Sequence, residues 1–403
     1  MTPTTRTPTP TTRTRSALLR CVGPVDTDRF LGEFWERRPL LVPRGEEGRF
    51  ADLLSEAEVE RMLTSTALRY PAFRLVKAGE RIALGDYAAD VPWRPTRFTG
   101  TIDVERVAAQ FERGATIVLQ ALHLHHLAVA EFCRALEGEL AHPVQANAYY
   151  TPRGAQGLPV HHDTHDVFCL QLGGTKRWLV YEPVLDLPLK NQRYAPGLGG
   201  PGSPVLDVVL RAGDTLYLPR GWLHEALTSD ADSLHLTVGV NVYTRLDAMR
   251  AALEEVGRHE VEYRRSLSDG ELPVDDLLSR LAERLASGDV ERRRREKFVA
   301  TRRPIRDDQF EQLRALEELD SETLVERRPT VIFDLSSGAD AVTLSFEGRS
   351  VSIPRHAREE VEAVARAEGP FRAADLPGDL DEGGRLVLVR RLLREGFLRL
   401  SAF

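Results

Sequence analysis

Residues 157–181 read GLPVHHDTHDVFCLQLGGTKRWLVY and place three histidines and two aspartates directly before an apolar, β-branched segment. One interpretation is a helix with His161 and His165 one turn apart, as in zinc proteases. That motif needs a glutamate after the first histidine, where this chain has His162. Pro159 before the cluster and VFCLQL after it favour extended chain instead. We therefore expect the polar cluster to lead into a strand of a β domain.

Strand geometry separates the members of this cluster. Residues i and i+2 of a strand share a face, so His161 and Asp163 should point together while His162 points away. A third ligand must come from elsewhere, and His224 in DTLYLPRGWLHEAL is the candidate, because turns surround the short strand that carries it. Two histidines and one carboxylate are the ligand set of non-haem Fe(II) oxygenases. An isolated HxD pair also occurs in strands that bind no metal.

Lys176 is the second feature of the opening stretch that indicates a ligand. It lies on the next predicted strand, TKRWLVY, where it alternates with Trp178. A lysine buried inside a barrel is unfavourable unless it meets an anion, and a dicarboxylate co-substrate would supply one. Only four of the 54 basic residues are lysines, which favours a specific role. The alternative, a surface lysine at the start of a strand, stays open.

Length and composition set the class of the protein. The chain has 403 residues, of which 42% are hydrophobic and 29% charged, as expected for a globular protein of two or three domains. A net charge of −7 favours a basic protein over nucleic acid as partner. Three widely spaced cysteines indicate free thiols in a reducing compartment. No apolar run is long enough for a membrane span and no secretory signal begins the chain, so we expect a cytoplasmic protein without membrane contact.

The chain divides by pattern into four parts. Residues 1–16 are almost entirely Thr, Pro and Arg, which predicts a disordered basic tail. Residues 17–245 begin with short helices and continue with many short strands separated by turns, which is typical of an all-β barrel or jelly roll. The expected strands include VQANAYYT, HDVFCLQL, KRWLVY, VLDVVL, DTLYLPR and SLHLTVGVNVY.

The two C-terminal parts differ in pattern from the β region. Residues 246–329 are helical and highly charged, and their apolar stripes need a partner, either each other or a second copy of the chain. Residues 330–403 mix strands and helices in a small α+β module resembling a winged helix. This module has 10 arginines against 12 acidic residues from position 331 onward, so direct DNA binding is not expected.

The motifs together resemble a known family. NAYYTP, HHDTHDVFCLQLGGTKRWLVYEP, YLPRGWLHEAL and SLHLTVGV, with the early FLGEFWERRPLLV, are similar to the JmjC-type ribosomal oxygenases. The resemblance extends over nearly the whole chain after the tail. It implies a mainly β fold with α elements: a double-stranded β-helix (jelly-roll or cupin JmjC) core at 17–245, a helical dimerisation domain at 246–329 and a winged-helix-like domain at 330–403.

The resemblance also implies roles for individual residues. His161, Asp163 and His224 match the iron ligands, and Lys176 matches the residue that binds the C5 carboxylate of 2-oxoglutarate. Asn147 matches a polar residue that lines the co-substrate and metal pocket, and Tyr149 matches an aromatic residue near the substrate channel, with plain packing as the alternative. His235 falls where the family also tends to have a histidine, and we expect a supporting role for it around the metal site. Thr237, two residues on and on the same strand face, is a candidate co-substrate contact. His165 has no counterpart among the ligands and is either a substrate contact or a surface histidine.

The implied activity is that of a dioxygenase using Fe(II), 2-oxoglutarate and O₂. It would hydroxylate an Arg or His side chain of a ribosomal protein and release succinate and CO₂, and the enzyme would be a homodimer. Two alternatives stay open: the same chemistry on another peptide, a tRNA or a small molecule, and a non-catalytic cupin-like binding protein.

Overall fold

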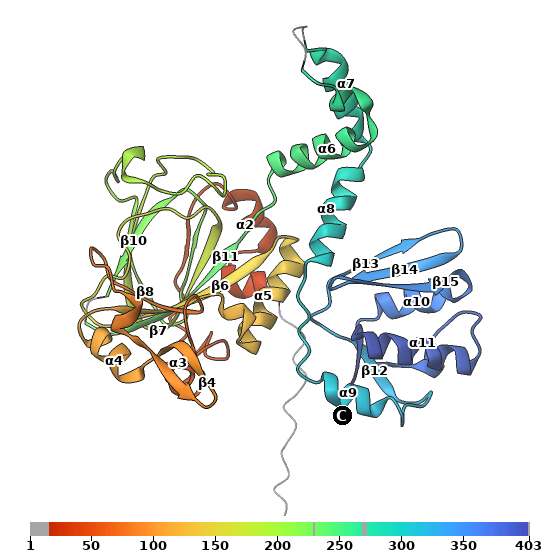
Figure 1. Cartoon of the computed structure of the whole chain (residues 1–403), viewed down its shortest axis with the longest axis horizontal. Coiled ribbons are helices and arrows are strands. Elements are labelled where there is room, and N and C mark those ends of the chain that lie inside the picture. The colour runs from red at the N-terminus through yellow and green to blue at the C-terminus, as the bar shows by residue number, and fades with distance from the viewer. Residues whose placement is uncertain (1–15, 229, 268–271, 402–403) are drawn as a thin grey trace, which may run out of the picture. The chain divides into compact units, whose positions relative to one another are not determined.

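The computed structural model describes residues 16–228, 230–267 and 272–401. They separate into two compact units, one ending at Val242 and the other beginning at Tyr243, each taken by itself below (Figure 1). Apart from Ser16, the predicted tail at 1–16 lies outside the described residues. Among the helices described, none has the length and apolar character that crossing a bilayer requires.

The first unit contains the short N-terminal helices and the β core. Its helices are α1 (Ala17–Val22), α2 (Thr27–Glu33), α3 (Glu56–Ser65), α4 (Val104–Glu112) and α5 (Leu127–Leu140). Its strands are β1 (Leu40–Val42), β2 (Phe73–Val76), β3 (Ala88–Trp93), β4 (Thr96–Ile102), β5 (Thr116–Leu119), β6 (Val144–Thr151), β7 (Asp166–Tyr181), β8 (Leu206–Arg211), β9 (Thr215–Leu218), β10 (Leu223–Leu227) and β11 (Ser233–Val240). The expected β core of the jelly-roll or cupin type is confirmed.

One long strand connects the two sheets of this core. The large antiparallel sheet has the order β1-β9-β7-β11-β6-β5-β2, and the second half of β7 pairs instead with β8 and β10. The bend lies at Gly173 and Gly174, beside an irregularity in the pairing with β11. Gly174 has φ +62°, and a Cβ there would lie 1.8 Å from the Asp232 carbonyl oxygen. The two strands expected at 165–172 and 176–181 are therefore one strand that bends at a glycine pair.

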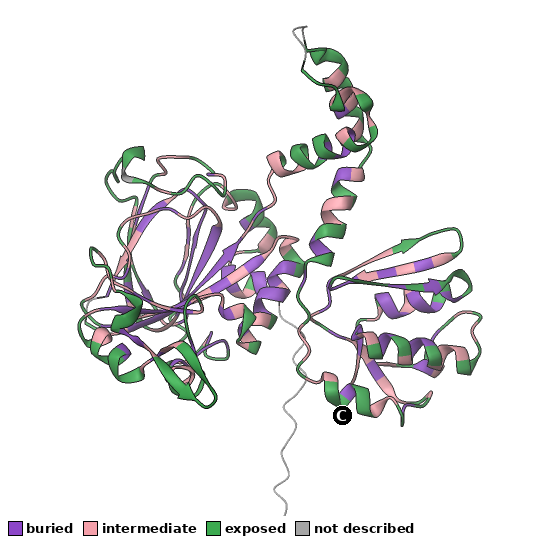
Figure 2. Ribbon diagram, in the orientation of Figure 1, coloured by how far each residue is buried: buried purple, intermediate pink, exposed green. Residues whose placement is uncertain are grey.

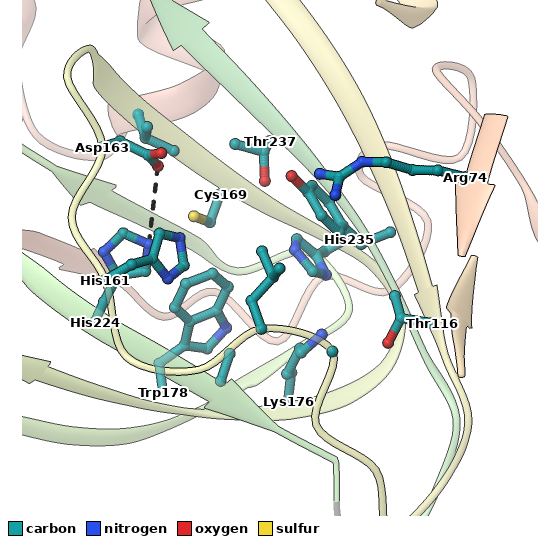
Figure 3. Close-up of a pocket in the computed structure, with 15 residues that line it drawn as sticks. Arg74, Thr116, His161, Asp163, Cys169, Lys176, Trp178, His224, His235 and Thr237 are labelled. Carbon is teal, nitrogen blue, oxygen red and sulfur yellow. Dashed lines mark ion pairs between the residues drawn. The ribbon is translucent and has the colours of Figure 1, made fainter. Parts of the chain in front are cut away.

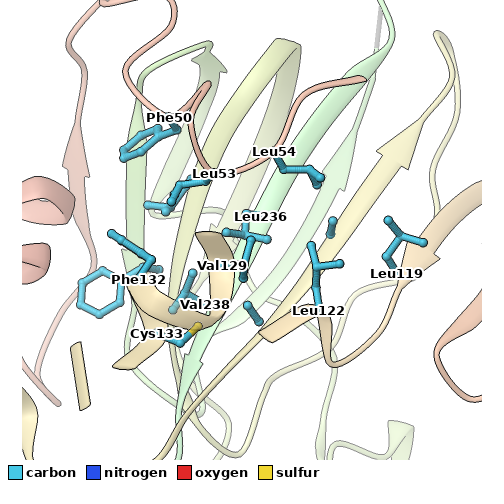
Figure 4. Packing of buried hydrophobic residues seen from close by; sticks show 14 of the residues in the cluster. Phe50, Leu53, Leu54, Leu119, Leu122, Val129, Phe132, Cys133, Leu236 and Val238 are labelled. Carbon is cyan, nitrogen blue, oxygen red and sulfur yellow. The ribbon is translucent and has the colours of Figure 1, made fainter. Parts of the chain in front are cut away.

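Side chains at alternate positions of a strand point either into the hydrophobic core or into a cavity. On β11, Leu234, Leu236 and Val238 belong to the hydrophobic core, whereas His235 and Thr237 between them line a cavity. The core lies on the outer face of the large sheet, where Val129, Phe132 and Cys133 of α5 pack against β11 (Figure 4). Buried residues concentrate in the strands and in α5 (Figure 2). The inner face carries the polar side chains of the cavity beside a smaller apolar cluster that includes Val167 and Trp178.

A buried ion-pair network fixes the start of β7. Asp166 is fully buried, and its carboxylate accepts hydrogen bonds from the Tyr217 hydroxyl at 2.8 Å and from the Arg220 guanidinium at 3.0 Å. Arg220 also pairs with Glu36. Removing one partner of such a group typically destabilises a protein by about 3–5 kcal/mol. Asp166 therefore has a structural role and holds the turn before β10 against β7.

The second unit combines helices with two small sheets. Its helices are α6 (Arg245–His259), α7 (Val274–Ala286), α8 (Asp289–Ala300), α9 (Gln309–Ala315), α10 (Arg358–Arg366) and α11 (Glu382–Glu395). Its strands are β12 (Leu324–Arg327), β13 (Phe333–Ser337), β14 (Ala341–Phe346), β15 (Arg349–Pro354), β16 (Phe371–Arg372) and β17 (Leu398–Leu400), in sheets of order β16-β12-β17 and β13-β14-β15. One apolar cluster joins α6, α7 and α8, and a larger one fills the C-terminal module.

Some elements differ from the sequence expectation. The hairpin of β3 and β4 was not among the expected strands, and it contains Pro92 paired with Arg97. Strand β12 lies within the segment expected to be helical, and it forms by pairing with β16 and β17, which come much later in the chain. Pairing between distant segments leaves no local sequence signal.

Candidate metal and co-substrate site

Backbone hydrogen bonds join the two segments that carry His161, Asp163 and His224. The His161 amide donates to the His224 carbonyl at 3.1 Å, and the His224 amide donates to the His161 carbonyl at 2.8 Å. The Gly221 amide donates to the Asp163 carbonyl at 3.1 Å. These bonds hold the loop before β7 against β10, so residues 58 to 63 positions apart are set at fixed separations.

The three side chains converge within this frame (Figure 3). One ligand atom from each lies within 4.8 Å of the other two. The His224 Nε2 atom is 3.8 Å from the nearer Asp163 carboxylate oxygen, and the two imidazole centroids are 4.5 Å apart. His162 points away, with its Nε2 atom 3.1 Å from the Gln192 carbonyl oxygen. His161 and Asp163 thus lie together and apart from His162, although residues 162–165 lie in the loop before β7 and not in a strand.

The backbone sets the tautomers of both histidines. The His161 Nδ1 atom is 2.8 Å from the Pro159 carbonyl oxygen, and the His224 Nδ1 atom is 3.0 Å from the Trp222 carbonyl oxygen. A carbonyl oxygen only accepts, so each Nδ1 carries the proton and each Nε2 presents a lone pair. Such contacts behind a ligand orient imidazoles for metal binding. The donor set therefore fits a divalent transition metal with open coordination positions.

The pKa shifts favour the protonation states that a metal needs. Burial, with the neighbouring His161, lowers the pKa of His224 to about 4, so its imidazole is neutral at physiological pH. Burial acts to raise the pKa of Asp163, but the charges of His165, His224 and His161 outweigh this and lower it. Asp163 thus offers a carboxylate and His224 a neutral nitrogen donor.

Lys176 lies in the same cavity without an acidic partner. Its Nζ atom donates to the Thr151 hydroxyl at 2.9 Å, and that hydroxyl also contacts the Thr116 hydroxyl at 3.1 Å. Within the residues described, no carboxylate forms an ion pair with Lys176. Burial lowers the pKa of Lys176 to about 7. A buried amine that meets only hydroxyl groups fits an anionic ligand.

The cavity lies between the two sheets and has a volume of about 250 Å³. Aromatic rings form one wall: Tyr149 stacks on His235 with centroids 5.0 Å apart, and Trp178 meets the edge of His235 at 5.5 Å. Burial, together with Lys176, lowers the pKa of His235 well below its usual value, so His235 is neutral. A neutral imidazole beside the lysine leaves the positive charge of the ammonium for a ligand.

The structure brings together most of the residues expected from the sequence. The cavity is lined by seven of the nine: His161, Asp163, His224, Lys176, Tyr149, Thr237 and His235. Asn147 does not line it, and the Asn147 amide oxygen instead accepts from the Ala121 amide at 2.9 Å. His165 packs over Gly239, where a Cβ would lie 3.0 Å from its Nε2 atom. The roles of Asn147 and His165 stay predictions.

Other cavity residues were not expected from the sequence. Arg74 on β2, Thr116 on β5 and Cys169 on β7 line it together with Gly157. The signal for Arg74 is present in the strand FRLV, where the arginine alternates with two core residues. That signal becomes informative only when the inner face of the strand is known.

Comparisons with known proteins agree with this architecture. Residues 122–247 match the family model described as JmjC domain. The chain is 33% identical over 267 residues to Ribosomal oxygenase 1 of Gallus gallus, which covers 64% of the chain and 42% of that protein. It is 30% identical over 273 residues to Ribosomal oxygenase 2 of Rattus norvegicus, which covers 63% of the chain and 56% of that protein. The chain thus spans about half the length of these curated relatives.

The chain contains a JmjC domain and is similar to ribosomal oxygenases. A similar fold is found in Escherichia coli ribosomal oxygenase YcfD, with a TM-score of 0.58, 18% identity and coverage of 94% of this chain and 98% of that one. A structure of YcfD in complex with cobalt and 2-oxoglutarate aligns with a TM-score of 0.56 at 18% identity, covering 94% and 99%. A third kind of relative, 29% identical over 266 residues, is the bifunctional lysine-specific demethylase and histidyl-hydroxylase NO66 of Drosophila persimilis, with 65% of this chain and 37% of that protein covered.

Mutation tests the metal site formed by His161, Asp163 and His224. Asp163→Ala should abolish tight binding of Co(II) or Fe(II), because two imidazoles alone do not complete the facial set. Titration calorimetry with Co(II) measures the effect. His162→Ala is the matched control, because its side chain points away from the triad. Equal affinity of Asp163→Ala and wild type for Co(II) would show that the metal is held elsewhere.

Proposed function

We propose that this protein is an Fe(II)- and 2-oxoglutarate-dependent dioxygenase that hydroxylates an Arg or His side chain of a ribosomal protein. One observation carries the proposal: the triad of His161, Asp163 and His224 shares a cavity with Lys176, a buried amine without an acidic partner. A metal site alone would fit many proteins. The combination with a lysine for a dicarboxylate is what favours this reaction.

The chain's own residues would bind and orient the reactants. His161, Asp163 and His224 would hold Fe(II), and Lys176 would pair with the far carboxylate of 2-oxoglutarate, with the Thr151 hydroxyl beside it. Fe(II) bound there would supply the oxidising chemistry, in which O₂ and 2-oxoglutarate give succinate and CO₂ while one oxygen atom enters a C–H bond of the target. The walls of the cavity would exclude bulk water from the reacting groups.

A ribosomal protein is the favoured class of substrate. The relatives are named ribosomal oxygenases and, in one case, a histidyl-hydroxylase. The net charge of −7 suits a basic partner, because complementary charge accelerates encounter. The three buried cysteines are free, which suits the reducing cytoplasm where ribosomal proteins are made.

The second unit would provide the dimer interface. Helix α6 exposes Met249 and Leu253, which are one turn apart, at 46% and 42% of their surface. Such a stripe favours a second helical surface as partner. We propose that residues 246–329 form a homodimer contact. Residues 330–403 would form a winged-helix-like module without a DNA-binding role.

Succinate formation tests the activity. Purified protein with Fe(II), ascorbate and 2-oxoglutarate should produce succinate, and ribosomal proteins should stimulate it. Lys176→Met should raise the 2-oxoglutarate concentration for half-maximal turnover by about 30-fold or more, because truncating one partner of a buried charge pair costs about 2–5 kcal/mol. Lys190→Met, at an exposed lysine, is the matched control. An unchanged requirement in Lys176→Met would exclude the proposed carboxylate contact.

The lowered pKa of Lys176 predicts a pH dependence of binding. Without ligand its pKa is about 7, so below pH 7 the amine is charged and above pH 7 it is increasingly neutral. A bound carboxylate favours the ammonium form, so binding above pH 7 takes up a proton. The Kd for 2-oxoglutarate should rise by up to about tenfold per pH unit above pH 7. Calorimetry on the Mn(II)-loaded protein in several buffers measures both the affinity and the proton uptake, and a flat Kd would contradict the assignment.

The dimer has its own test. The chain mass is 45.1 kDa, and sedimentation velocity should show a species of twice this mass. Replacing Met249 and Leu253 together by Asp should shift the protein toward monomer, because burying charges at an apolar contact is unfavourable. Val387→Asp, at a residue 66% exposed on α11, is the control. A wild-type monomer at micromolar concentration would contradict the proposal.

A further inference from the structure

Arg74 lies at the end of a row of side chains that crosses the inner face of the large sheet. Strand register pairs Arg74 with Val118, Val118 with Tyr149, and Tyr149 with His235. Directly paired residues of antiparallel strands project from the same face. The neighbours of Arg74 on β2, Phe73 and Leu75, belong to the core on the opposite face. Arg74 is therefore directed into the cavity that contains the metal triad and Lys176 (Figure 3).

The surroundings of Arg74 supply no counter-charge. Its guanidinium forms a hydrogen bond with the Tyr149 hydroxyl, and this bond and the positive charge oppose the rise in the Tyr149 pKa. The Arg74 Nε atom is buried and has no hydrogen-bond partner. In the part of the chain that the structure describes, no carboxylate forms an ion pair with Arg74, in contrast to Arg220, which pairs with Asp166 and Glu36. The cavity therefore contains a second cation whose charge the protein does not balance.

The proposed reactants do not balance it either. Fe(II) carries two positive charges, and 2-oxoglutarate carries two negative charges. Asp163 adds a negative charge and Lys176 a positive one, so this group is neutral and the charge of Arg74 remains. Burial and the charge of Asp163 raise the pKa of Tyr149 to about 12, so the phenol keeps its proton. When Arg74 donates to the Tyr149 oxygen, the phenol proton is free to be donated into the cavity.

We infer that Arg74 and Tyr149 form a subsite that selects a target side chain with a hydrogen-bond acceptor and no positive charge. A neutral imidazole, a carboxamide and a carboxylate fit this chemistry. A guanidinium or an ammonium group would meet the like charge of Arg74 in a desolvated cavity and would be rejected. The inference rests on the proposed function and narrows it, because it separates histidine from arginine as a target.

Oriented peptide libraries test the subsite. Each library has the same randomised flanks and one fixed central residue: His, Asn, Asp, Arg or Lys. The full-length protein is assayed with Fe(II), ascorbate and 2-oxoglutarate, and mass spectrometry detects the gain of one oxygen atom. Succinate formed without peptide is measured in parallel. We expect kcat/KM for at least one acceptor-centred library to exceed that for the Arg- and Lys-centred libraries by about tenfold or more.

A binding measurement makes the test independent of turnover. The same libraries, labelled with fluorescein, are titrated with the protein loaded with Mn(II) and 2-oxoglutarate, and anisotropy gives their affinities. Acceptor-centred peptides should bind more tightly than cation-centred ones. If wild type forms no succinate but shows this binding preference, the proposed function fails and the inference stands. If succinate forms and Arg- or Lys-centred peptides are preferred, or no library is bound selectively, the inference is overturned.

Two variants connect the preference to the named residues. Arg74→Gln removes the charge but keeps a donor, and it should reduce the ratio of acceptor-centred to cation-centred kcat/KM by about tenfold, chiefly through KM. Tyr149→Phe keeps the ring on His235 and should reduce affinity for the acceptor-centred peptides. Arg113→Gln, at an exposed arginine outside the cavity, is the matched control and should retain the wild-type ratio. A wild-type ratio in Arg74→Gln, with an unchanged melting temperature, would also overturn the inference.

Discussion

The candidate site depends on the bend at Gly173 and Gly174, where β7 leaves the large sheet and joins the small one. A side chain at position 174 would collide with the Asp232 carbonyl oxygen, so close contact between β7 and the start of β11 requires glycine there. Because of the bend, one strand supplies both walls of the cavity. Cys169 faces it from the large sheet and Lys176 from the small one. A straight strand could not bring these two positions to opposite sides of one ligand.

The metal ligands are positioned by backbone hydrogen bonds that also depend on β7. The loop before β7 is tied to β10 by reciprocal backbone bonds between His161 and His224, and β10 is itself paired to the second half of β7. The imidazoles are oriented by carbonyl oxygens two residues before them, not by other side chains. The geometry of the triad is therefore a property of the backbone. Backbone carbonyl groups thus take the place of the carboxylates that often orient metal-binding histidines.

The parts of the site formed by residues close in sequence could be predicted, whereas the parts formed by residues far apart in sequence could not. His161 and Asp163 are two residues apart, so an extended backbone places them on one side and His162 on the other, and this could be predicted without knowledge of the fold. Arg74 enters the cavity through the register of β2, β5, β6 and β11, and no local pattern shows that register. The same holds for Thr151, whose hydroxyl becomes relevant only when β7 bends toward it. Most helices and strands could be predicted from periodicity, whereas the bend in β7 resembled a turn between two strands because both cases contain paired glycines.

The use of lysine at position 176, in a chain that otherwise prefers arginine, has a physical reason. In the ligand-free protein the Lys176 amine has only hydroxyl groups as partners. A lysine can tolerate this by losing its proton, and the drop of its pKa from 10.5 to about 7 corresponds to about 5 kcal/mol against the buried ammonium. Since the folded pKa is lower than the unfolded one, the stability of the ligand-free protein should rise with pH between those two values. An arginine keeps its charge throughout the accessible pH range and would have to remain a buried, unpaired cation. Arg74 can be an arginine because it is less deeply buried and has the Tyr149 hydroxyl beside it, whereas the deeper position needs a base that can become neutral.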